Sequence, residues 1–204
     1  MPLLITFDGP KGVGKTTLIH LVEQRLREAG HGVEVLVEKE LMAATLGPSL
    51  DEAYQALKRE PGEASDAQVA RLHRQGRVLI GERQLSASTA DVVLLDRWYP
   101  SDAVFRRHID VVEAIDANLR DGVRVADIAF AVVCRAEVSW ERAHQRTRRL
   151  DSKVIDSFND HRVSTERFER IASDYGRHLV RSDSMSANEL SRQVIDAIQA
   201  KLSF

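Results

Sequence analysis

Short strand-like runs alternate along this chain with longer segments in which apolar residues recur every three or four positions. The runs are residues 3–7, 33–37, 91–95, 128–134 and 178–181. Near-continuous apolar runs of this length are typical of strands buried on both faces of a parallel sheet. The longer segments predict helices over 16–29, 50–59, 65–85, 110–119, 137–149 and 158–175, with a last helix after a capping box of Ser186 and Glu189. Strands that alternate with helices predict an α/β fold, a three-layer sandwich with helices on both faces of a parallel sheet.

Composition narrows the class of protein. The chain has 204 residues, of which 43% are hydrophobic and 29% charged, and this fits one domain over residues 1–204. The net charge of −2 gives no field that favours nucleic acid or membrane as a partner. A single cysteine, Cys134, excludes a disulfide scaffold and favours a cytoplasmic location. The seven histidines show no metal-ligand spacing, so we expect no zinc site.

A glycine-rich loop between the first strand and the first helix gives the clearest chemical signal. Residues 9–16 read G-P-K-G-V-G-K-T, which fits the pattern G-x-x-x-x-G-K-[ST]. Glycines let such a loop turn its N–H groups toward phosphates, and the helix N-terminus adds to the same field. The alternative is an ordinary glycine-rich turn. The candidate nucleotide-binding residues are Gly9, Lys11, Gly12, Val13, Gly14, Lys15, Thr16 and Thr17.

A second charged motif, Asp96-Arg97-Trp98, follows the third predicted strand. An aspartate at the tip of a strand beside a phosphate loop can hold Mg²⁺, and an adjacent arginine offers a planar fork for a phosphate. Trp98 would either stack on an acceptor base or fill core space. The alternative for the whole motif is a surface ion pair. Because ligands of parallel sheets bind at the carboxyl ends of strands, we group Asp8 and residues 38–40 with this motif.

A basic segment follows the fourth strand and contains Arg142, Arg146, Arg148 and Arg149, with Lys153 beyond them. Phosphoryl transfer spreads negative charge over the moving group, and a lid of arginines would stabilise that charge and exclude water. A solvated basic helix end, which the helix dipole favours, is the alternative. We expect the lid at about residues 137–157.

The loop at residues 9–17, the Asp96-Arg97-aromatic motif with Ser101, and the arginine-rich segment together resemble the thymidylate kinase group of nucleoside monophosphate kinases. The resemblance implies a P-loop kinase domain with a five-stranded parallel sheet, usually a homodimer, that uses ATP and Mg²⁺. It implies that Lys15 and Thr16 serve ATP and Mg²⁺, that Asp96 organises the magnesium, and that Arg97 grips the acceptor phosphate. The spacing of Arg74 ahead of the third strand resembles that of an arginine that the family directs toward the acceptor base.

These considerations give three sets of candidate site residues. The catalytic set is Lys15, Asp96, Arg97, Arg146 and Arg149. Nucleotide binding adds Arg142, Arg146 and Asp183 to the loop residues, and the metal ligands are Thr16 and Asp96. The acceptor-binding set is Asp8, Glu38, Arg74, Arg97 and Trp98.

The chain also departs from the family pattern. Lys11 stands where the family usually carries an acid, and residues 38–41 replace an Arg-Glu-Pro-Gly run. The family commonly has a glutamine near the position of Arg106 in this chain, and Ser152 stands where the family has a lid arginine. All of these positions touch the acceptor side or the lid, whereas the phosphate loop is intact. The sequence therefore predicts ATP-dependent phosphoryl transfer to dTMP, to a related or modified nucleotide, or to another small acceptor.

Two other functions remain open from the sequence. Asp96-Arg97 with Ser101-Asp102 also resembles the deoxynucleoside kinases, in which a glutamate after the second strand is the general base, a role that Glu38 or Glu40 could fill. A nucleotide-binding regulatory protein without catalysis is the other alternative. The cationic residues Lys11, Arg74 and Arg97 favour a phosphorylated acceptor over a nucleoside, and the basic lid segment disfavours a simple regulatory switch.

Overall fold

The computed structural model describes residues 1–145 and 157–202, and its centre is a parallel sheet of five strands. The strands are β1 (Leu3–Asp8), β2 (Val33–Val37), β3 (Val92–Asp96), β4 (Ile128–Val133) and β5 (His178–Arg181), in the spatial order β2-β3-β1-β4-β5. Every pair of neighbours is parallel, so the strands have their carboxyl ends at the same edge of the sheet. The predicted α/β fold with a five-stranded parallel sheet is confirmed.

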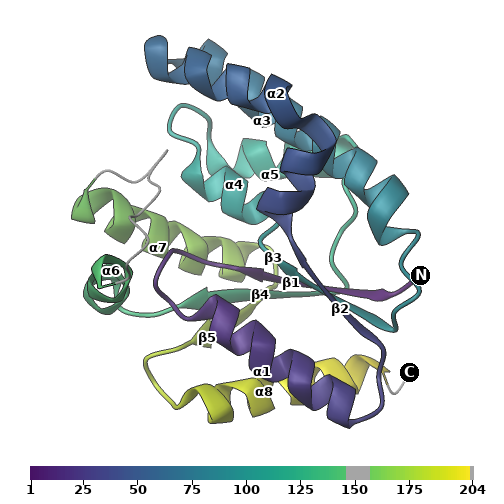
Figure 1. Ribbon diagram of the computed structural model, residues 1–204. Coiled ribbons are helices and arrows are strands. Elements are labelled where there is room, and N and C mark those ends of the chain that lie inside the picture. Colours follow the sequence, from purple (N-terminus) through teal and green to yellow (C-terminus); the bar gives the residue numbers. More distant parts are fainter. Residues whose placement is uncertain (146–156, 203–204) are drawn as a thin grey trace.

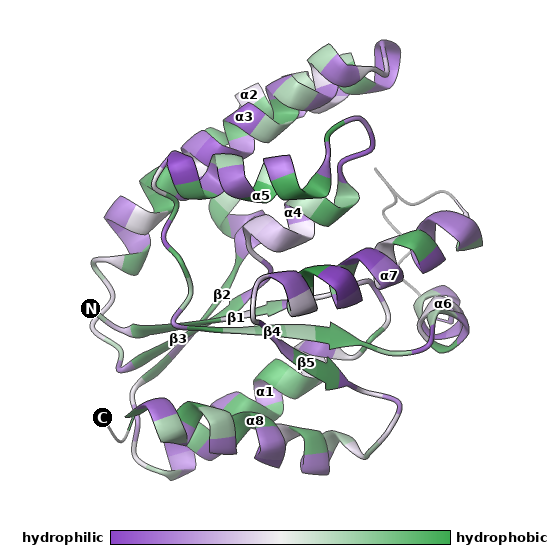
Figure 2. Cartoon of the chain, turned by 180° about the vertical axis from the view of Figure 1, so that it is seen from behind, coloured by the Kyte–Doolittle hydropathy of each residue, from purple (hydrophilic) through white to green (hydrophobic). Residues whose placement is uncertain are grey.

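Helices cover both faces of this sheet, as Figures 1 and 2 show from opposite sides. One face carries α1 (Lys15–Glu28) and α8 (Ala187–Leu202). The other carries α4 (Tyr99–Phe105), α5 (Val111–Arg120) and α7 (Phe158–Asp174). Beyond α4 and α5 lies an outer pair, α2 (Glu38–Arg59) and α3 (Glu63–Ile80), and α6 (Ala136–His144) follows the carboxyl end of β4.

Strand β3 shows why the apolar runs are continuous. Val93 and Leu95 belong to a core cluster shared with α2–α5 and α7, whereas Val92 and Leu94 belong to a second cluster shared with α1 and α8. All four side chains are fully buried. Because successive side chains point to opposite faces of a strand, a strand covered on both sides needs an apolar residue at every position. The first charged residue, Asp96, therefore comes where β3 ends at the edge of the sheet.

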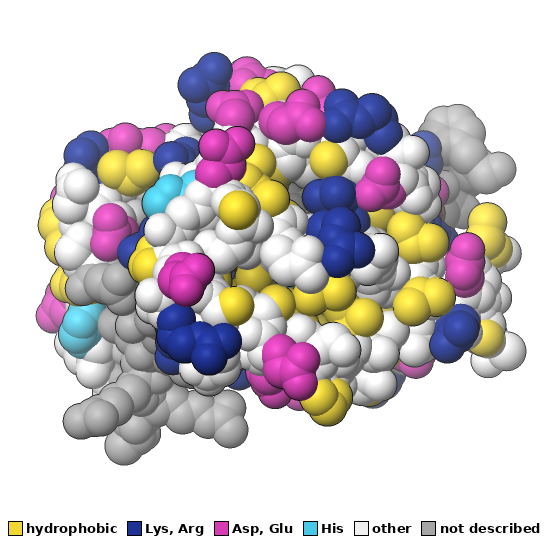
Figure 3. Space-filling view, turned by 90° about the horizontal axis from the view of Figure 1, so that it is seen from above, with side chains coloured by type: hydrophobic (Ala, Val, Ile, Leu, Met, Phe, Trp, Pro, Cys, Tyr) yellow, Lys and Arg dark blue, Asp and Glu magenta, His cyan; other side chains and the backbone are white. Residues whose placement is uncertain are grey.

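The surface shows mixed charge on the side that carries α2 and α3. Figure 3 looks down on this side, and positive and negative side chains lie close together there with small hydrophobic groups between them. This mixture agrees with the near balance of 29 Lys and Arg against 31 Asp and Glu. Among the helices that the structure describes, none combines the length and the hydropathy that crossing a membrane requires.

Two helices differ from the sequence prediction. The helix expected over 50–59 begins much earlier, because α2 starts at Glu38 and continues through a kink at Gly47, which has φ 41° and ψ −117°. Gly47 and Pro48 interrupt the apolar pattern, so the sequence predicts only the second half of this helix. The helix expected over 65–85 is α3 followed by a π-helical turn, Gly81–Leu85.

The two polar helix caps that the sequence predicts are confirmed. Asp110 accepts hydrogen bonds from the N–H groups of Val112 and Glu113 at the start of α5. Ser186 and Glu189 exchange hydrogen bonds before α8, with Glu189 N at 3.3 Å from Ser186 Oγ. The helix expected over 137–149 begins as α6, and its predicted end lies outside the described residues.

Candidate functional site

The loop between β1 and α1 can be built only with glycine at two of its positions. A Cβ at Gly9 would lie 2.0 Å from the carbonyl oxygen of Val132, and one at Gly12 would lie 2.0 Å from that of Ser139. Gly12 and Gly14 also have positive φ angles, 82° and 90°. The loop is thus held closely against β4 and α6, and its own backbone lines the start of α1.

This loop presents positive charge at its centre. Lys15 is the first residue of α1 and is only 7% exposed, and its Nζ donates to the carbonyl oxygens of Gly9 at 3.0 Å and Pro10 at 2.9 Å. The hydroxyl-bearing residues Thr16 and Thr17 follow in the first turn and are exposed. The N–H groups of this turn, the dipole of α1 and the Lys15 ammonium point to one anion site. The chemistry of the loop fits a polyphosphate.

Asp96 lies next to this loop across the sheet. Its register partner on β1 is Phe7, two residues before Gly9. One carboxylate oxygen of Asp96, Oδ1, is buried and has no hydrogen-bond partner among the described residues. A buried carboxylate oxygen without a partner, beside a hydroxyl-bearing helix start, suits a hard cation such as Mg²⁺. Within residues 1–145 and 157–202, no group of three or more His, Cys, Asp or Glu side chains forms a metal site by itself.

Arg97 has an unusual backbone. Its φ is 71°, and it is the one non-glycine residue with positive φ in the part of the chain that the structure describes. The guanidinium carbon lies 5.3 Å from the centre of the Phe105 ring, and Nη1 is 3.3 Å from Ser101 Oγ. A left-handed conformation at a non-glycine residue is strained and often marks a functional site.

Trp98 belongs to the core. Its side chain is 0% exposed, and its indole N–H donates to the carbonyl oxygen of Arg124 at 2.9 Å. A ring without exposed surface offers no face to a base. The structure therefore corrects the acceptor-stacking role proposed for Trp98 and supports its alternative as a core residue.

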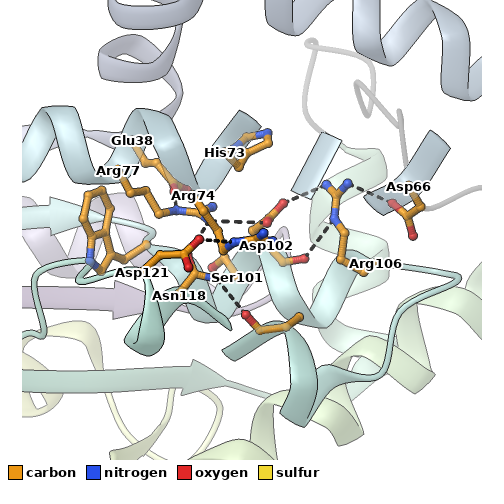
Figure 4. Close-up of polar contacts among 12 residues, drawn as sticks. Glu38, Asp66, His73, Arg74, Arg77, Ser101, Asp102, Arg106, Asn118 and Asp121 are labelled. Atoms are coloured by element: carbon orange, nitrogen blue, oxygen red, sulfur yellow. Dashed lines mark hydrogen bonds and ion pairs between the residues drawn. The ribbon is translucent and has the colours of Figure 1, made fainter. Parts of the chain in front are cut away.

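A buried cluster of charged side chains, which we call the ion-pair cluster, joins α2, α3, α4 and α5 (Figure 4). Arg77 is 0% exposed and contacts Glu38 at 2.7 Å, Asp102 at 3.4 Å and Asn118 at 3.0 Å. Arg106 continues the chain of contacts, with Asp102 at 2.7 Å and Asp66 at 2.9 Å. The members of the cluster are Glu38, Asp66, Arg77, Asp102, Arg106 and Asn118.

Burial shifts the acid–base properties of this region. Burial raises the pKa of Glu38, against the opposing charge of Arg77. It would also raise the pKa of Asp102, but neighbouring charges, that of Arg106 first, hold it well below its usual range. His73, whose Nε2 lies 3.0 Å from the Tyr54 hydroxyl, has a pKa lowered to about 3 by burial. His73 is therefore neutral and Asp102 ionised near neutral pH.

The structure distinguishes two of the arginines of α3, Arg74 and Arg77. Arg77 reaches Glu38 and Asp102, whereas Arg74, one turn earlier, pairs with Asp121 at 2.7 Å. Sequence reasoning missed Arg77, because two arginines three positions apart share a helix face and no local pattern distinguishes them. The ion pairs of Asp66 and Asp102 were also missed, although Asp102 was named in the Ser101-Asp102 motif, since an aspartate in the sequence gives no signal of a distant partner.

Three further predicted residues, Asp8, Asp183 and Arg142, lie in the described part of the chain. Asp8, at the end of β1, is buried and bonded to the segment that follows Arg97. Asp183 accepts from the N–H of Arg135 at 3.0 Å, and this backbone hydrogen bond lowers the pKa of Asp183. Arg142 is exposed on α6. Arg146 and Arg149 lie outside the described residues, as do most residues of the predicted lid.

Comparisons with known proteins agree on one family. A family model described as thymidylate kinase matches residues 7–195. The chain is 23% identical to a thymidylate kinase from Sulfurihydrogenibium sp. (strain YO3AOP1) over 98% of both chains. It is 24% identical to a thymidylate kinase from Bacillus pumilus (strain SAFR-032), over 98% of this chain and 96% of the relative.

The fold has a counterpart among solved structures. The crystal structure of thymidylate kinase from Ehrlichia chaffeensis superimposes with a TM-score of 0.60 and 20% identity, over 97% of this chain and 98% of that one. The similarity thus extends over both layers of helices and the sheet. Together with the family match, it shows that this chain belongs to the thymidylate kinase family of P-loop nucleotide kinases.

Proposed function

We propose that this protein transfers the γ-phosphate of ATP to a nucleoside monophosphate, dTMP or a related nucleotide. The observation that carries the proposal is the placement of an intact phosphate loop beside the end of the neighbouring strand β3, where Asp96 is the last residue and Arg97 follows. Family membership supports the same reaction.

Each side chain has a defined task in this proposal. Lys15 and the loop N–H groups hold the phosphates of ATP, and Thr16 and Asp96 hold Mg²⁺, which supplies charge neutralisation at the transferred group. Arg97 grips the acceptor phosphate through its planar fork and orients it toward the loop. Arg142, Arg146 and Arg149 would complete the charge stabilisation from the lid, with the backbone near Asp183 facing the adenine.

One observation favours the deoxynucleoside kinase as a second candidate. Glu38 directly follows β2, the strand beside β3, and burial raises its pKa, which brings a carboxylate closer to the range of an effective general base. Its ion pair with Arg77 at 2.7 Å opposes this role, because the guanidinium occupies one carboxylate oxygen.

A product assay separates the candidates. The purified chain would be incubated with ATP and Mg²⁺ and with dTMP, dUMP, dCMP, dAMP, dGMP, thymidine or deoxycytidine in turn, and the products separated by anion-exchange chromatography. We expect a nucleoside diphosphate from at least one monophosphate, with dTMP or its nearest analogue fastest. A Lys15→Ala sample prepared in parallel shows whether a contaminating kinase is responsible. Monophosphates formed from nucleosides alone would overturn the proposal, and ATP binding without any product would favour a regulatory protein.

We also propose that the chain acts as a cytoplasmic homodimer, as is usual in the family. Sedimentation velocity of the purified protein over a range of concentrations gives the oligomeric state directly. A monomer at all concentrations would contradict the dimer without affecting the proposed reaction.

A further inference from the structure

The strained backbone of Arg97 is held in place by the end of strand β1. The N–H of Arg97 donates to the carbonyl oxygen of Phe7 at 3.0 Å, and the N–H of the next residue, Trp98, donates to Asp8 Oδ1 at 3.0 Å. The two peptide groups on either side of the Arg97 Cα are thus both bonded to β1. A conformation that costs free energy persists only where its surroundings fix it, and these two bonds supply that restraint.

Asp8 also reaches the side chain of Arg97 through Ser101. Asp8 Oδ1 accepts from the Ser101 N–H at 3.1 Å and from the Ser101 hydroxyl at 2.6 Å. Because the hydroxyl hydrogen is donated to the carboxylate, the oxygen lone pairs are left for the Arg97 guanidinium, whose Nη1 lies 3.3 Å away. The carboxylate of Asp8 therefore sets which way Ser101 faces, and Ser101 contacts the arginine.

The surroundings of Asp8 exclude direct contact with a substrate. The residue is 0% exposed, and its second oxygen, Oδ2, lies 3.9 Å from Arg177 Nη1. The Arg177 guanidinium in turn lies over the Tyr99 ring at 5.5 Å, and its side chain is only 7% exposed, so a buried cation balances the carboxylate of Asp8. An acceptor molecule has no path to either oxygen in this arrangement.

We propose that Asp8 is a positioning residue that holds the backbone and the guanidinium of Arg97 in the orientation that grips the acceptor phosphate. This assignment rests on the proposed function and replaces the acceptor-binding role that the sequence predicts for Asp8. It differs from a purely structural role in one respect. The effect of Asp8 on the acceptor must pass through Arg97.

The chain offers a matched control for this proposal. Asp66 is also buried, at 2% exposure, and also accepts two backbone N–H groups, those of Arg107 and His108, both at 3.0 Å. It too pairs with an arginine, Arg106, at 2.9 Å. Asp66 and Asp8 thus serve comparable structural roles, but only Asp8 is linked to Arg97 in the described structure.

The first test is kinetic. Asp8→Asn, Ser101→Ala and Asp66→Asn would be compared with wild type for the KM of the acceptor, the KM of ATP and the thermal midpoint. We expect Asp8→Asn to raise the acceptor KM by about tenfold or more with the KM of ATP within about twofold. Ser101→Ala should raise the acceptor KM by a smaller factor. Asp66→Asn should lower the thermal midpoint without a selective rise in the acceptor KM. An unchanged acceptor KM in both Asp8→Asn and Ser101→Ala, or an equal shift in Asp66→Asn, would overturn the proposal.

The second test places Asp8→Asn in an Arg97→Ala background. If Asp8 acts through Arg97, the double variant should have the acceptor KM of Arg97→Ala alone. A further rise of tenfold in the double variant would mean that Asp8 acts on the acceptor independently.

The third test does not require turnover. The ¹H–¹⁵N signal of the Arg97 side chain, assigned by its loss in Arg97→Lys, reports whether the guanidinium is rigid. We expect a rigid signal in wild type and in Asp66→Asn, and a mobile one in Asp8→Asn and Ser101→Ala. If wild type phosphorylates no acceptor, the proposed function fails while this measurement still decides the positioning role. A signal equally rigid in all four proteins overturns the positioning role alone.

Discussion

The phosphate loop and the ion-pair cluster lie at the same edge of the sheet but are built in opposite ways. The loop is built from backbone: its key groups, all within residues 9–17, are N–H donors, two tightly packed glycines and the buried Lys15. The cluster is built from side chains that come from four helices, with partners such as Arg77 and Glu38 separated by 39 positions. A backbone site tolerates almost no change at its glycines, whereas a side-chain site depends on charge balance. The following predictions test this contrast.

The largest effect should come from Lys15, the buried lysine of the loop. Lys15→Ala removes the cation at the centre of the anion site, and we expect kcat/KM to fall by at least about a thousandfold while the fold is retained. ADP release and circular dichroism would measure the two quantities. Lys201→Ala, at the exposed end of α8, is the control and should behave as wild type. Loss of helical signal in Lys15→Ala would mean that the lysine is mainly structural.

Arg77→Leu should give the next largest effect, and on stability. It leaves Glu38 and Asp102 buried without the charge of their shared partner, and breaking such a buried pair costs about 3–5 kcal/mol of unfolding free energy. Arg74→Leu breaks a partly exposed pair with Asp121 and should cost about 1 kcal/mol or less. Urea titration measures both. Equal losses would contradict the distinction between the two arginines, and a raised acceptor KM in Arg74→Leu would support the predicted acceptor contact of Arg74.

Gly12→Ala should show that a side chain at this position is opposed both by lack of space and by the positive φ angle of the backbone. Gly12 and Gly30 have similar φ angles, 82° and 90°, but a Cβ at Gly30 meets no atom within 4 Å among the described residues. Alanine at Gly30 should cost about 1–2 kcal/mol from its left-handed backbone alone. Gly12→Ala should cost at least about 1 kcal/mol more, because its Cβ overlaps the Ser139 carbonyl and must displace α6. Calorimetry of the pair measures the difference, and equal costs would refute the steric part.

The smallest predicted effect is the change in unfolding free energy per pH unit near neutral pH. The pKa of His73 is about 3 in the folded protein against 6.5 ordinarily, so between these values the unfolded chain binds a proton that the native protein does not. Stability from this group is therefore lost as pH falls below about 6.5, at about 1.4 kcal/mol per pH unit. Glu38, with its raised pKa, has the opposite sign above 4.5, where its contribution falls as pH rises.

Comparison of variants separates the contribution of His73 to the pH dependence of the unfolding free energy from that of Glu38. His73→Gln retains a group that can bond the Tyr54 hydroxyl, and it should reduce the dependence of unfolding free energy on pH between 6 and 4 by about 1.4 kcal/mol per unit. His20, which is exposed on α1, provides His20→Gln as the control for the substitution itself. A slope in His73→Gln equal to that of wild type would contradict the burial effect.

Local patterns made most of the fold and the phosphate loop predictable. The continuous apolar strand at residues 92–95, the cap at Asp110 and the glycine spacing of the loop each depend on neighbours within a few positions. The ion-pair cluster was not predictable for the opposite reason. Nothing near Arg77 in sequence indicates Asp102, and only the packing of α3 on α4 brings them together. Trp98 shows a third case, in which one residue type suits both a core and a stacking site, and burial alone decides between them.

The π-helical turn at Gly81–Leu85 has a consequence for how the gene can change. The N–H of Ser86 donates to the carbonyl oxygen of Gly81, five residues back, so this turn contains one residue more than an α-helical turn. Deletion of one codon there would leave a turn of α-helical length, so the segment could lose one residue and still keep Arg77 on the side of α3 that meets Glu38 and Asp102. Natural selection on this segment should therefore act on its length less strongly than on the arginine that precedes it.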